Sequence, residues 1–442
     1  MKNHKVNKVI LLSILYLISL TVIFFGLFYS SKGLAGWENI RLIMFLLFIP
    51  LLTKYLIHLL IVPWYGVVNR ANFKKIKEDY QPMVSFVIPA YNEEVGIIKT
   101  IESILKSDYK KFELIVVNDG STDKTGDLVK LFIKEYRGNI PIIYFDKRNG
   151  GKSSALNLAI KESRGKIIIT SDADCAIDPL AIHNLVKHFS NKDVMATAGN
   201  VIVGNNTKIL GSIQKLEYIY GFYFKRADSL LNSVYIVGGA AAAYRREIFD
   251  KLGYFDEEII TEDIEYSTRI LNSGHKIRYA ADAIFYTESP SCVSDLIKQR
   301  LRWKYGRLKT FLKYNDLFFR VRGKHSKFLS FITLPVALFA EMLLFLEVIL
   351  LPAFFTYSII SRDFIPLIFA MSFLTVIIFL QIITGDKFKE NKDVIFWAPV
   401  AWLIFYFVDF IEYMALMKTL IKMIKNKKIY WQKWERVGVF GS

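Results

Sequence analysis

The sequence predicts an α/β domain inserted between apolar helices that span a membrane. Short β-branched runs alternate with helical patterns over residues 80–290, which is typical of a mostly parallel sheet with helices on both faces. Long apolar runs flank this region on both sides. Of the 442 residues, 53% are hydrophobic, more than the roughly 45–50% usual in soluble domains. Part of the chain is therefore expected outside water.

Residues 1–62 are predicted to form two membrane helices. The apolar runs Val9–Tyr29 and Ile40–Val62 are each long enough to cross a bilayer, which takes about 20 residues. The first run has a basic start but no small-residue cleavage site, so it is expected to remain as an anchor. With the short link Ser30–Asn39 outside, the chain from about residue 63 onward would lie inside the cell.

The remaining boundaries follow from composition. We expect the α/β domain at 63–292, amphipathic interface helices at 293–327, transmembrane or interfacial helices at 328–421, and a basic tail at 422–442. Three crossings after residue 328 would place this Lys-rich tail outside, against the positive-inside rule. Either one C-terminal segment lies in the interface, or the tail is outside.

The net charge of +17 is concentrated beside the apolar stretches. Residues 298–327 hold eleven Lys or Arg and one acid, and residues 418–436 hold seven and one. This distribution fits the positive-inside rule and contact with a lipid bilayer that carries anionic headgroups. No nucleic-acid-binding motif accompanies it, so no nucleic-acid partner is expected.

Polar side chains follow the first two predicted strands, Val84–Ile88 and Phe112–Val117. Glu93 comes shortly after the first strand and Asp119 directly after the second. Ligands of such sheets bind at the carboxyl ends of the strands. One acid there is explained equally well by helix capping, as at Asp123. Two adjacent strand ends with acids favour a ligand that donates from hydroxyl and ring N–H groups, such as a nucleoside.

Two further strand ends carry motifs for a diphosphate and a metal. After the predicted strand Pro141–Phe145, Gly150-Gly151-Lys152 begins a helix, which favours a diphosphate, although a plain tight turn explains it as well. After the predicted strand Lys166–Thr170 come Asp172 and Asp174. Two acids so close favour a hard divalent ion bridging to a diphosphate.

The segment Thr261-Glu262-Asp263 begins a predicted helix. Thr and acids at a helix start are ordinary capping residues. The functional interpretation is that Asp263 acts as a general base that takes a proton from an acceptor hydroxyl.

A second motif, Gln299-x-x-Arg302-Trp303, lies in the basic amphipathic helix. Its Arg can pair with a diphosphate, and its indole face can stack on a sugar. The alternative is one more basic turn with an aromatic anchor at the membrane.

Taken in this order, the segments resemble the processive family 2 glycosyltransferases. The poly-N-acetylglucosamine synthases of the biofilm type are closest, and hyaluronan, chitin and cellulose synthases are more distant. The resemblance covers about residues 80–310 and the membrane flanks in outline. It implies a GT-A type nucleotide-sugar-binding domain inserted between transmembrane helices of the plasma membrane, with the catalytic domain in the cytoplasm.

The resemblance implies that UDP-GlcNAc is polymerised, with inversion, into extracellular poly-β-1,6-GlcNAc that passes across the membrane. The partners would be a UDP-sugar, the growing polysaccharide and the bilayer; a small membrane partner subunit stays open. Alternatives are a hyaluronan or chitin synthase, or a non-processive transferase to a lipid-linked acceptor. A non-catalytic sensor of nucleotide sugars is disfavoured by the intact Asp174 and Asp263.

The resemblance also implies residue roles. The nucleotide-sugar would be bound by Ala90, Tyr91, Glu93, Asp119, Lys152, Asp172 and Arg302. The metal, Mg²⁺ or Mn²⁺, would be bound by Asp174, and catalysis would involve Asp263 and Glu262. The acceptor would be bound by Gln299, Trp303, Gly239 and Arg245. The tail segment 431–436 resembles the gating segment of related synthases. The acids expected to line a polar path through the membrane, unless they merely lie near helix ends, are Glu341, Glu347, Asp409 and Glu412.

Overall fold

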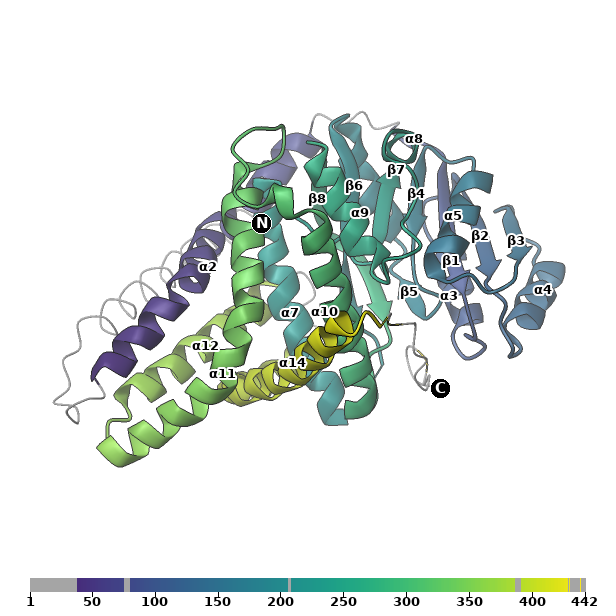
Figure 1. The fold of residues 1–442 in the computed structure, drawn as a ribbon. Coiled ribbons are helices and arrows are strands. Elements are labelled where there is room, and N and C mark those ends of the chain that lie inside the picture. Colours follow the sequence, from purple (N-terminus) through teal and green to yellow (C-terminus); the bar gives the residue numbers. More distant parts are fainter. Residues whose placement is uncertain are drawn as a thin grey trace.

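The computed structural model describes residues 38–74, 80–205, 208–385, 391–427, 429 and 438. An α/β domain and a group of long helices lie side by side (Figure 1). The predicted first membrane helix, Val9–Tyr29, and the expected gating segment, 431–436, lie outside the described residues.

The α/β domain is built on a sheet of eight strands among the described residues, in the order β3-β2-β1-β4-β7-β6-β8-β5. The strands are β1 Val84–Ala90, β2 Phe112–Asn118, β3 Ile142–Asp146, β4 Ile167–Thr170, β5 Cys175–Ile177, β6 Val194–Val203, β7 Ala242–Arg245 and β8 Lys276–Thr287. Strands β1 to β4 run parallel. Strand β7 runs antiparallel to β4 and β6, and β5 runs antiparallel to β8. The sheet is therefore parallel in one half and mixed in the other.

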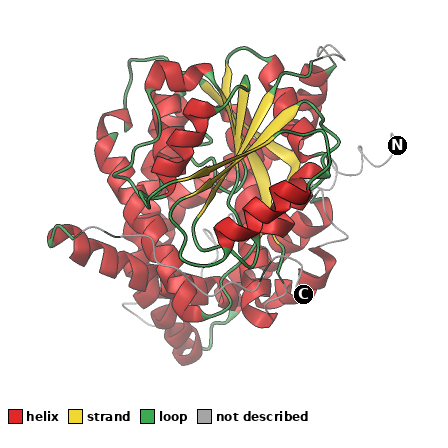
Figure 2. Ribbon diagram, turned by 90° about the vertical axis from the view of Figure 1, so that its right-hand side faces the viewer, coloured by secondary structure: helices red, strands yellow, loops and turns green. Residues whose placement is uncertain are grey.

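Helices cover both faces of the sheet (Figure 2). Those of the α/β domain are α3 Ile97–Leu105, α4 Thr125–Glu135, α5 Lys152–Glu162, α6 Ala181–Val186, α7 Lys208–Leu231, α8 Glu247–Leu252, α9 Glu262–Asn272 and α10 Val293–Lys313. Because strand side chains alternate, Val87 of β1 packs in the core with Ile160 of α5, whereas Ile88 packs with Ile101 of α3. Each such fully buried side chain contributes about 1.5–3 kcal/mol.

The predicted α/β class is confirmed, with all four predicted strands present within a few residues of their expected bounds. The four strands of the mixed half of the sheet were not among those predicted. Strand β7 joins it antiparallel to β4, with Ala242 opposite Thr170. The loop that precedes β7 is therefore brought to the same edge as the acids that follow β4.

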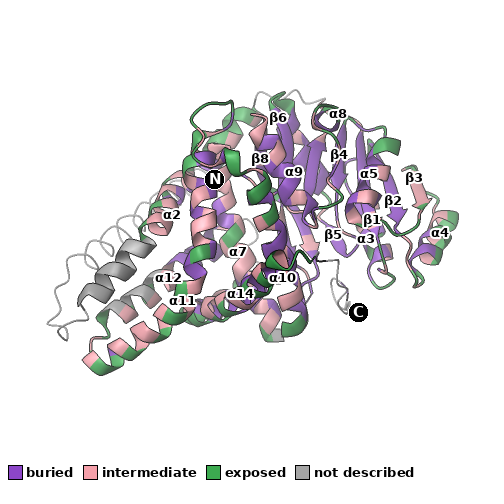
Figure 3. Cartoon of the chain, in the orientation of Figure 1, coloured by how far each residue is buried: buried purple, intermediate pink, exposed green. Residues whose placement is uncertain are grey.

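The long helices are α2 Glu38–Phe73, α11 Leu334–Ser361, α12 Ile365–Thr384 and α14 Ala401–Ile424. Within the described chain, the segments Ile49–Phe73, Leu329–Ser361 and Lys392–Ile424 are long and apolar enough to cross a membrane. Their surfaces are much less buried than the strands of the sheet (Figure 3). Such apolar, exposed helix surfaces are expected to face lipid.

The last apolar segment, Lys392–Ile424, begins and ends on the side of the α/β domain. At its start, the Asp393 carboxylate forms an ion pair with Nζ of Lys215 in α7 at 2.8 Å. Beyond its end, Ile429 packs in a cluster with Leu301 of α10, and the Gly438 amide donates to Glu288 at 3.1 Å. The described residues of the tail therefore lie against the α/β domain.

Two of the basic side chains of helix α10 point into the molecule. Arg300 and Lys304, which were expected on the basic face of this helix, are buried. Lys304 pairs with Glu341 of α11 at 2.7 Å and with Glu412 of α14 at 2.6 Å. Arg300 pairs with Glu217 of α7 at 2.6 Å. The acids come from distant parts of the chain, so the pattern of α10 alone did not reveal them. Burying these cations requires such partners.

A glycine sets how closely α10 approaches α9. A Cβ atom at Gly306 would lie only 1.9 Å from the Thr261 hydroxyl oxygen, at the start of α9. The two helices are closely packed at this contact, as the 4% exposure of Thr261 indicates. The contact holds the Gln299–Trp303 turn of α10 beside the first turn of α9.

We predict that Gly306→Ala lowers the melting temperature of the protein in nanodiscs. In an unobstructed helix, replacing Gly by Ala stabilises the folded state by about 0.5–1 kcal/mol. At a contact that is already filled, the added Cβ atom overpacks the site and destabilises the folded state by roughly 1–3 kcal/mol. The matched control is Gly221→Ala in α7, where an added Cβ meets nothing within 4 Å. It should leave the melting temperature unchanged or raise it. Equal melting temperatures for both variants would contradict the close contact.

Candidate active site

Lys152, the first residue of α5, lies at the centre of a cluster of acids. Its Nζ atom is 2.6 Å from Asp172 and 2.9 Å from Glu262. Burial alone would lower the pKa of Lys152, but the carboxylates of Asp172, Glu262 and Asp263 raise it well above its usual value. Burial also raises the pKa of Glu262, with Asp263 adding to the effect and Lys152 opposing it. The lysine is therefore a fixed cation that joins the residues after β4 to the first turn of α9.

Gly239 lies directly beside this cluster, in the loop that leads into β7. Its amide donates to Asp263 at 2.9 Å. A Cβ atom there would lie 2.7 Å from Nζ of Lys152 and 3.3 Å from Glu262. Only glycine fits without displacing the lysine. The hydrogen bond orients the half-buried Asp263 carboxylate, which is the predicted general base.

Asp172, Asp174 and Cys175 form a group that could hold a metal ion. One ligand atom from each lies within 4.8 Å of the others. Burial raises the pKa of the Cys175 thiol well above its usual value, and Asp174 and Asp172 add to this, so the thiol is a poor ligand. The two carboxylates suit a hard ion such as Mg²⁺ or Mn²⁺. The residues present therefore fit the predicted metal.

Asp119, a predicted nucleoside ligand, holds the glycine turn in this structure. Its carboxylate accepts hydrogen bonds from Lys147 at 2.6 Å and from the amides of Gly150 and Gly151 at 3.0 and 2.8 Å. The turn places Gly151 at a φ of 89°, which favours glycine, immediately before Lys152. Asp119 thus fixes the start of α5 and with it the central lysine. A ligand that binds Asp119 would replace part of these contacts.

The other predicted nucleotide residues lie on the adjoining loop after β1. The Ala90 carbonyl accepts from the Asp119 amide at 2.8 Å, which ties the ends of β1 and β2 together. The Glu93 amide donates to Thr125 at 2.8 Å. Tyr91 is 38% exposed, so its ring is available at the surface. The structure brings these residues to the same edge of the sheet as Asp119.

The site candidates of α10 lie one to two turns before the Gly306 contact. Gln299, an acceptor-site candidate, and Arg302, a nucleotide-sugar candidate, are both buried. Within the described part of the chain, Gln299 Oε1 has no hydrogen-bond partner. The Arg300 guanidinium lies 4.4 Å from the centre of the Trp303 ring, so one face of the indole is already covered.

Arg245 is not brought together with the other candidates. It ends β7 opposite Ile167, at the start of β4, whereas Asp172 and Asp174 follow the end of β4. Its guanidinium donates to the carbonyls of Phe189 at 2.6 Å and Asn191 at 3.0 Å. In this position Arg245 binds backbone at the far edge of the sheet.

Two site residues went unnoticed in the sequence. Lys147 pairs with Asp119. The sequence feature that could have identified it is its position, since it is a basic residue directly after β3 at the same edge of the sheet. Cys175 lies beside the acid pair, and nothing in the sequence distinguished it from an ordinary buried thiol.

Comparisons with known proteins agree with this geometry. Residues 85–253 match the family model described as glycosyl transferase family 2. The chain is 27% identical over 379 residues to a poly-beta-1,6-N-acetyl-D-glucosamine synthase of Staphylococcus epidermidis, covering 81% of this chain and 88% of that protein. It is 33% identical over 245 residues to a protein of the same name from Staphylococcus aureus strain COL, covering 54% of this chain and 58% of that protein.

Among solved structures, a mannosyltransferase of Pyrobaculum calidifontis in complex with GDP-Man and Mn²⁺ shares the fold. The TM-score is 0.56 at 20% sequence identity, and the match covers 86% of this chain and 99% of that chain. The fold is of GT-A type. The sequence matches lead to one conclusion: the chain is a hexosyltransferase in which residues 85–253 match glycosyl transferase family 2.

Proposed function

We propose that the protein polymerises N-acetylglucosamine from UDP-GlcNAc into poly-β-1,6-GlcNAc at the cytoplasmic face of the plasma membrane and passes the product across it. The observation that carries the proposal is the contact of α10 with both halves of the molecule. Through Gly306 it adjoins the acid cluster at α9, and through Lys304 it pairs with the apolar helices α11 and α14. The names of the two staphylococcal relatives support the choice of sugar.

The chemistry follows from the residues around Lys152. The amide of Gly239 orients the carboxylate of Asp263, which takes the proton of the acceptor hydroxyl. The hydroxyl oxygen attacks the anomeric carbon in line with the departing UDP, so the configuration inverts. Arg302 and Lys152 offset the negative charge that develops on the diphosphate. Asp174 and Asp172 would hold Mg²⁺ or Mn²⁺, which when bound neutralises part of the same charge.

The membrane helices would provide the route for the product. Glu341 and Glu412 were expected to line a polar path, and both instead pair with Lys304. An ion-paired cluster is polar although its net charge is small, so it can accept hydrogen bonds from sugar hydroxyls at the level of α10. The path would begin at Trp303, one residue before Lys304.

We predict that Asp263→Asn abolishes sugar transfer while UDP still binds. A positioned general base contributes about 10²–10⁴-fold to rate, and an amide cannot accept the proton. Transfer is measured with radiolabelled UDP-GlcNAc and UDP binding by calorimetry, using the protein in nanodiscs.

The matched control for Asp263→Asn is Asp250→Asn, an exposed acid of α8. It should retain full activity. Undiminished transfer by the Asp263 variant would refute its role as base. Loss of UDP binding along with transfer would instead assign Asp263 a structural role.

The sugar and the polymer are tested by offering UDP-GlcNAc, UDP-GlcA and UDP-Glc separately to the purified protein in nanodiscs. We expect a polymer from UDP-GlcNAc alone, which a hydrolase specific for β-1,6-linked GlcNAc degrades. A polymer from another donor would contradict the assigned sugar. A single sugar added to a lipid would contradict polymerisation.

A further inference from the structure

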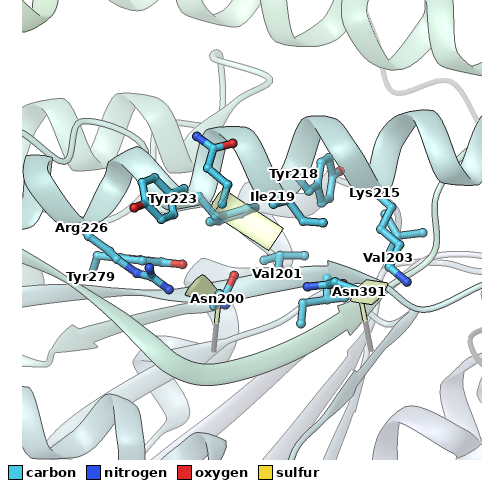
Figure 4. Close-up of a pocket in the computed structure, with 14 residues that line it drawn as sticks. Asn200, Val201, Val203, Lys215, Tyr218, Ile219, Tyr223, Arg226, Tyr279 and Asn391 are labelled. Atoms are coloured by element: carbon cyan, nitrogen blue, oxygen red, sulfur yellow. The ribbon is translucent and has the colours of Figure 1, made fainter. Parts of the chain in front are cut away.

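A cleft outside the candidate active site lies where α7 crosses the end of β6. It comprises about 490 Å³ of space, open in part to solvent. Tyr218, Ile219 and Tyr223 of α7 form one wall, and Asn200 and the following residues of β6 form the floor (Figure 4). The remaining wall comes from Gln381 and Gly385 at the C-terminal end of α12 and from Asn391. No residue assigned above to the donor or acceptor site lines it.

Two amide side chains in this wall are buried without hydrogen-bond partners. Gln381 is 2% exposed, and neither its Nε2 nor its Oε1 has a partner within the described part of the chain. Asn391 is 7% exposed, and the same holds for its Oδ1. A buried polar group left unsatisfied costs about 1–3 kcal/mol. Three such atoms on one cleft indicate a polar occupant.

The cleft has two cationic side chains in its lining. Lys215 forms an ion pair with Asp393 at 2.8 Å. The Arg226 guanidinium lies 5.2 Å from the centre of the Tyr223 ring. The other walls are mainly aromatic, including Tyr218 and Tyr279.

The unpartnered atoms decide between ligand chemistries. Gln381 offers a donor and an acceptor together, so the occupant must both accept and donate hydrogen bonds. A phosphate headgroup at neutral pH only accepts, whereas sugar hydroxyls do both. Tyrosine rings beside such amides suit the C–H face and polar rim of a pyranose.

We propose that this cleft is a second saccharide site, which binds one neutral pyranose unit of a glycan. It is separate from the donor and acceptor sites and lies beside the end of α12. The choice of N-acetylglucosamine as the sugar rests on the proposed function; the class of ligand does not. The site shares α7 with the active region, because Glu217, the neighbour of Tyr218, pairs with Arg300 of α10 at 2.6 Å.

The test measures binding of a β-1,6-linked GlcNAc tetrasaccharide by equilibrium dialysis, with the full-length protein in neutral-lipid nanodiscs and no donor. The wild type should bind two equivalents. Gln381→Leu should bind one, and Trp303→Ala, which alters the acceptor site, should also bind one. Leucine is similar in volume and removes two unsatisfied buried atoms, so Gln381→Leu should melt no lower than wild type.

The control is Ser372→Ala, an exposed residue of α12 outside the cleft, which should bind two equivalents. The proposal is overturned if Gln381→Leu binds as many equivalents as the wild type, whether that number is two or one. A single wild-type equivalent that Gln381→Leu loses and Trp303→Ala retains would support the cleft and contradict the acceptor site. Displacement of the Gln381-dependent equivalent by anionic phosphatidylglycerol in the nanodisc would identify a lipid site and overturn it too. The assay contains no UDP-sugar, so failure of the transfer reaction leaves its outcome unaffected.

Discussion

The site depends on one half-buried cation, Lys152, that offsets acids from separate parts of the chain. Without it, Asp172 and Glu262 would repel one another at a sheet edge where burial already disfavours charge. Asp119 fixes the lysine by holding the turn before α5. The close approach of Gly239 then orients Asp263. The carboxylates of Asp172, Glu262 and Asp263 outnumber the single cation Lys152, so the region is net negative. A diphosphate can enter it only if further positive charge comes with it.

A second set of buried charges joins this site to the apolar helices. Lys304 contacts acids of α11 and α14, and Arg300 contacts α7. An intact buried ion pair contributes little net stability. Removing one partner destabilises the protein strongly, because the other charge is then buried without a partner. Helix α10 is thereby fixed between the acid cluster and the membrane helices. Movement of one would be transmitted to the other, which suits an enzyme that adds sugars at one end of a path and moves the product along it.

The sequence predicted the parallel half of the sheet and its acids well, because strand ends and short motifs are local. Asp119, Asp172 and Asp174 lie on the expected edge. The pairing of these residues was not predictable, since Lys147 reaches Asp119 and Glu262 reaches Lys152 through tertiary contacts. Glu262 itself was among the expected site residues, whereas Lys147 was not. Arg245 was placed by motif resemblance, yet its antiparallel strand carries it to the far edge of the sheet. The basic face of α10 resembled a membrane-facing surface because the acidic partner of Lys304 and Arg307 on α11 lies 34 or more residues away.

The central claim is that the acid cluster binds a nucleotide diphosphate together with a divalent ion. It is tested most directly by calorimetric titration of UDP into the protein in nanodiscs, with Mn²⁺ and with EDTA. Binding of the two ligands should be coupled, by about 5- to 150-fold in affinity. We predict that Mn²⁺ strengthens UDP binding by at least about tenfold, and that Asp174→Asn removes this gain. Equal UDP affinity in Mn²⁺ and in EDTA would contradict the account.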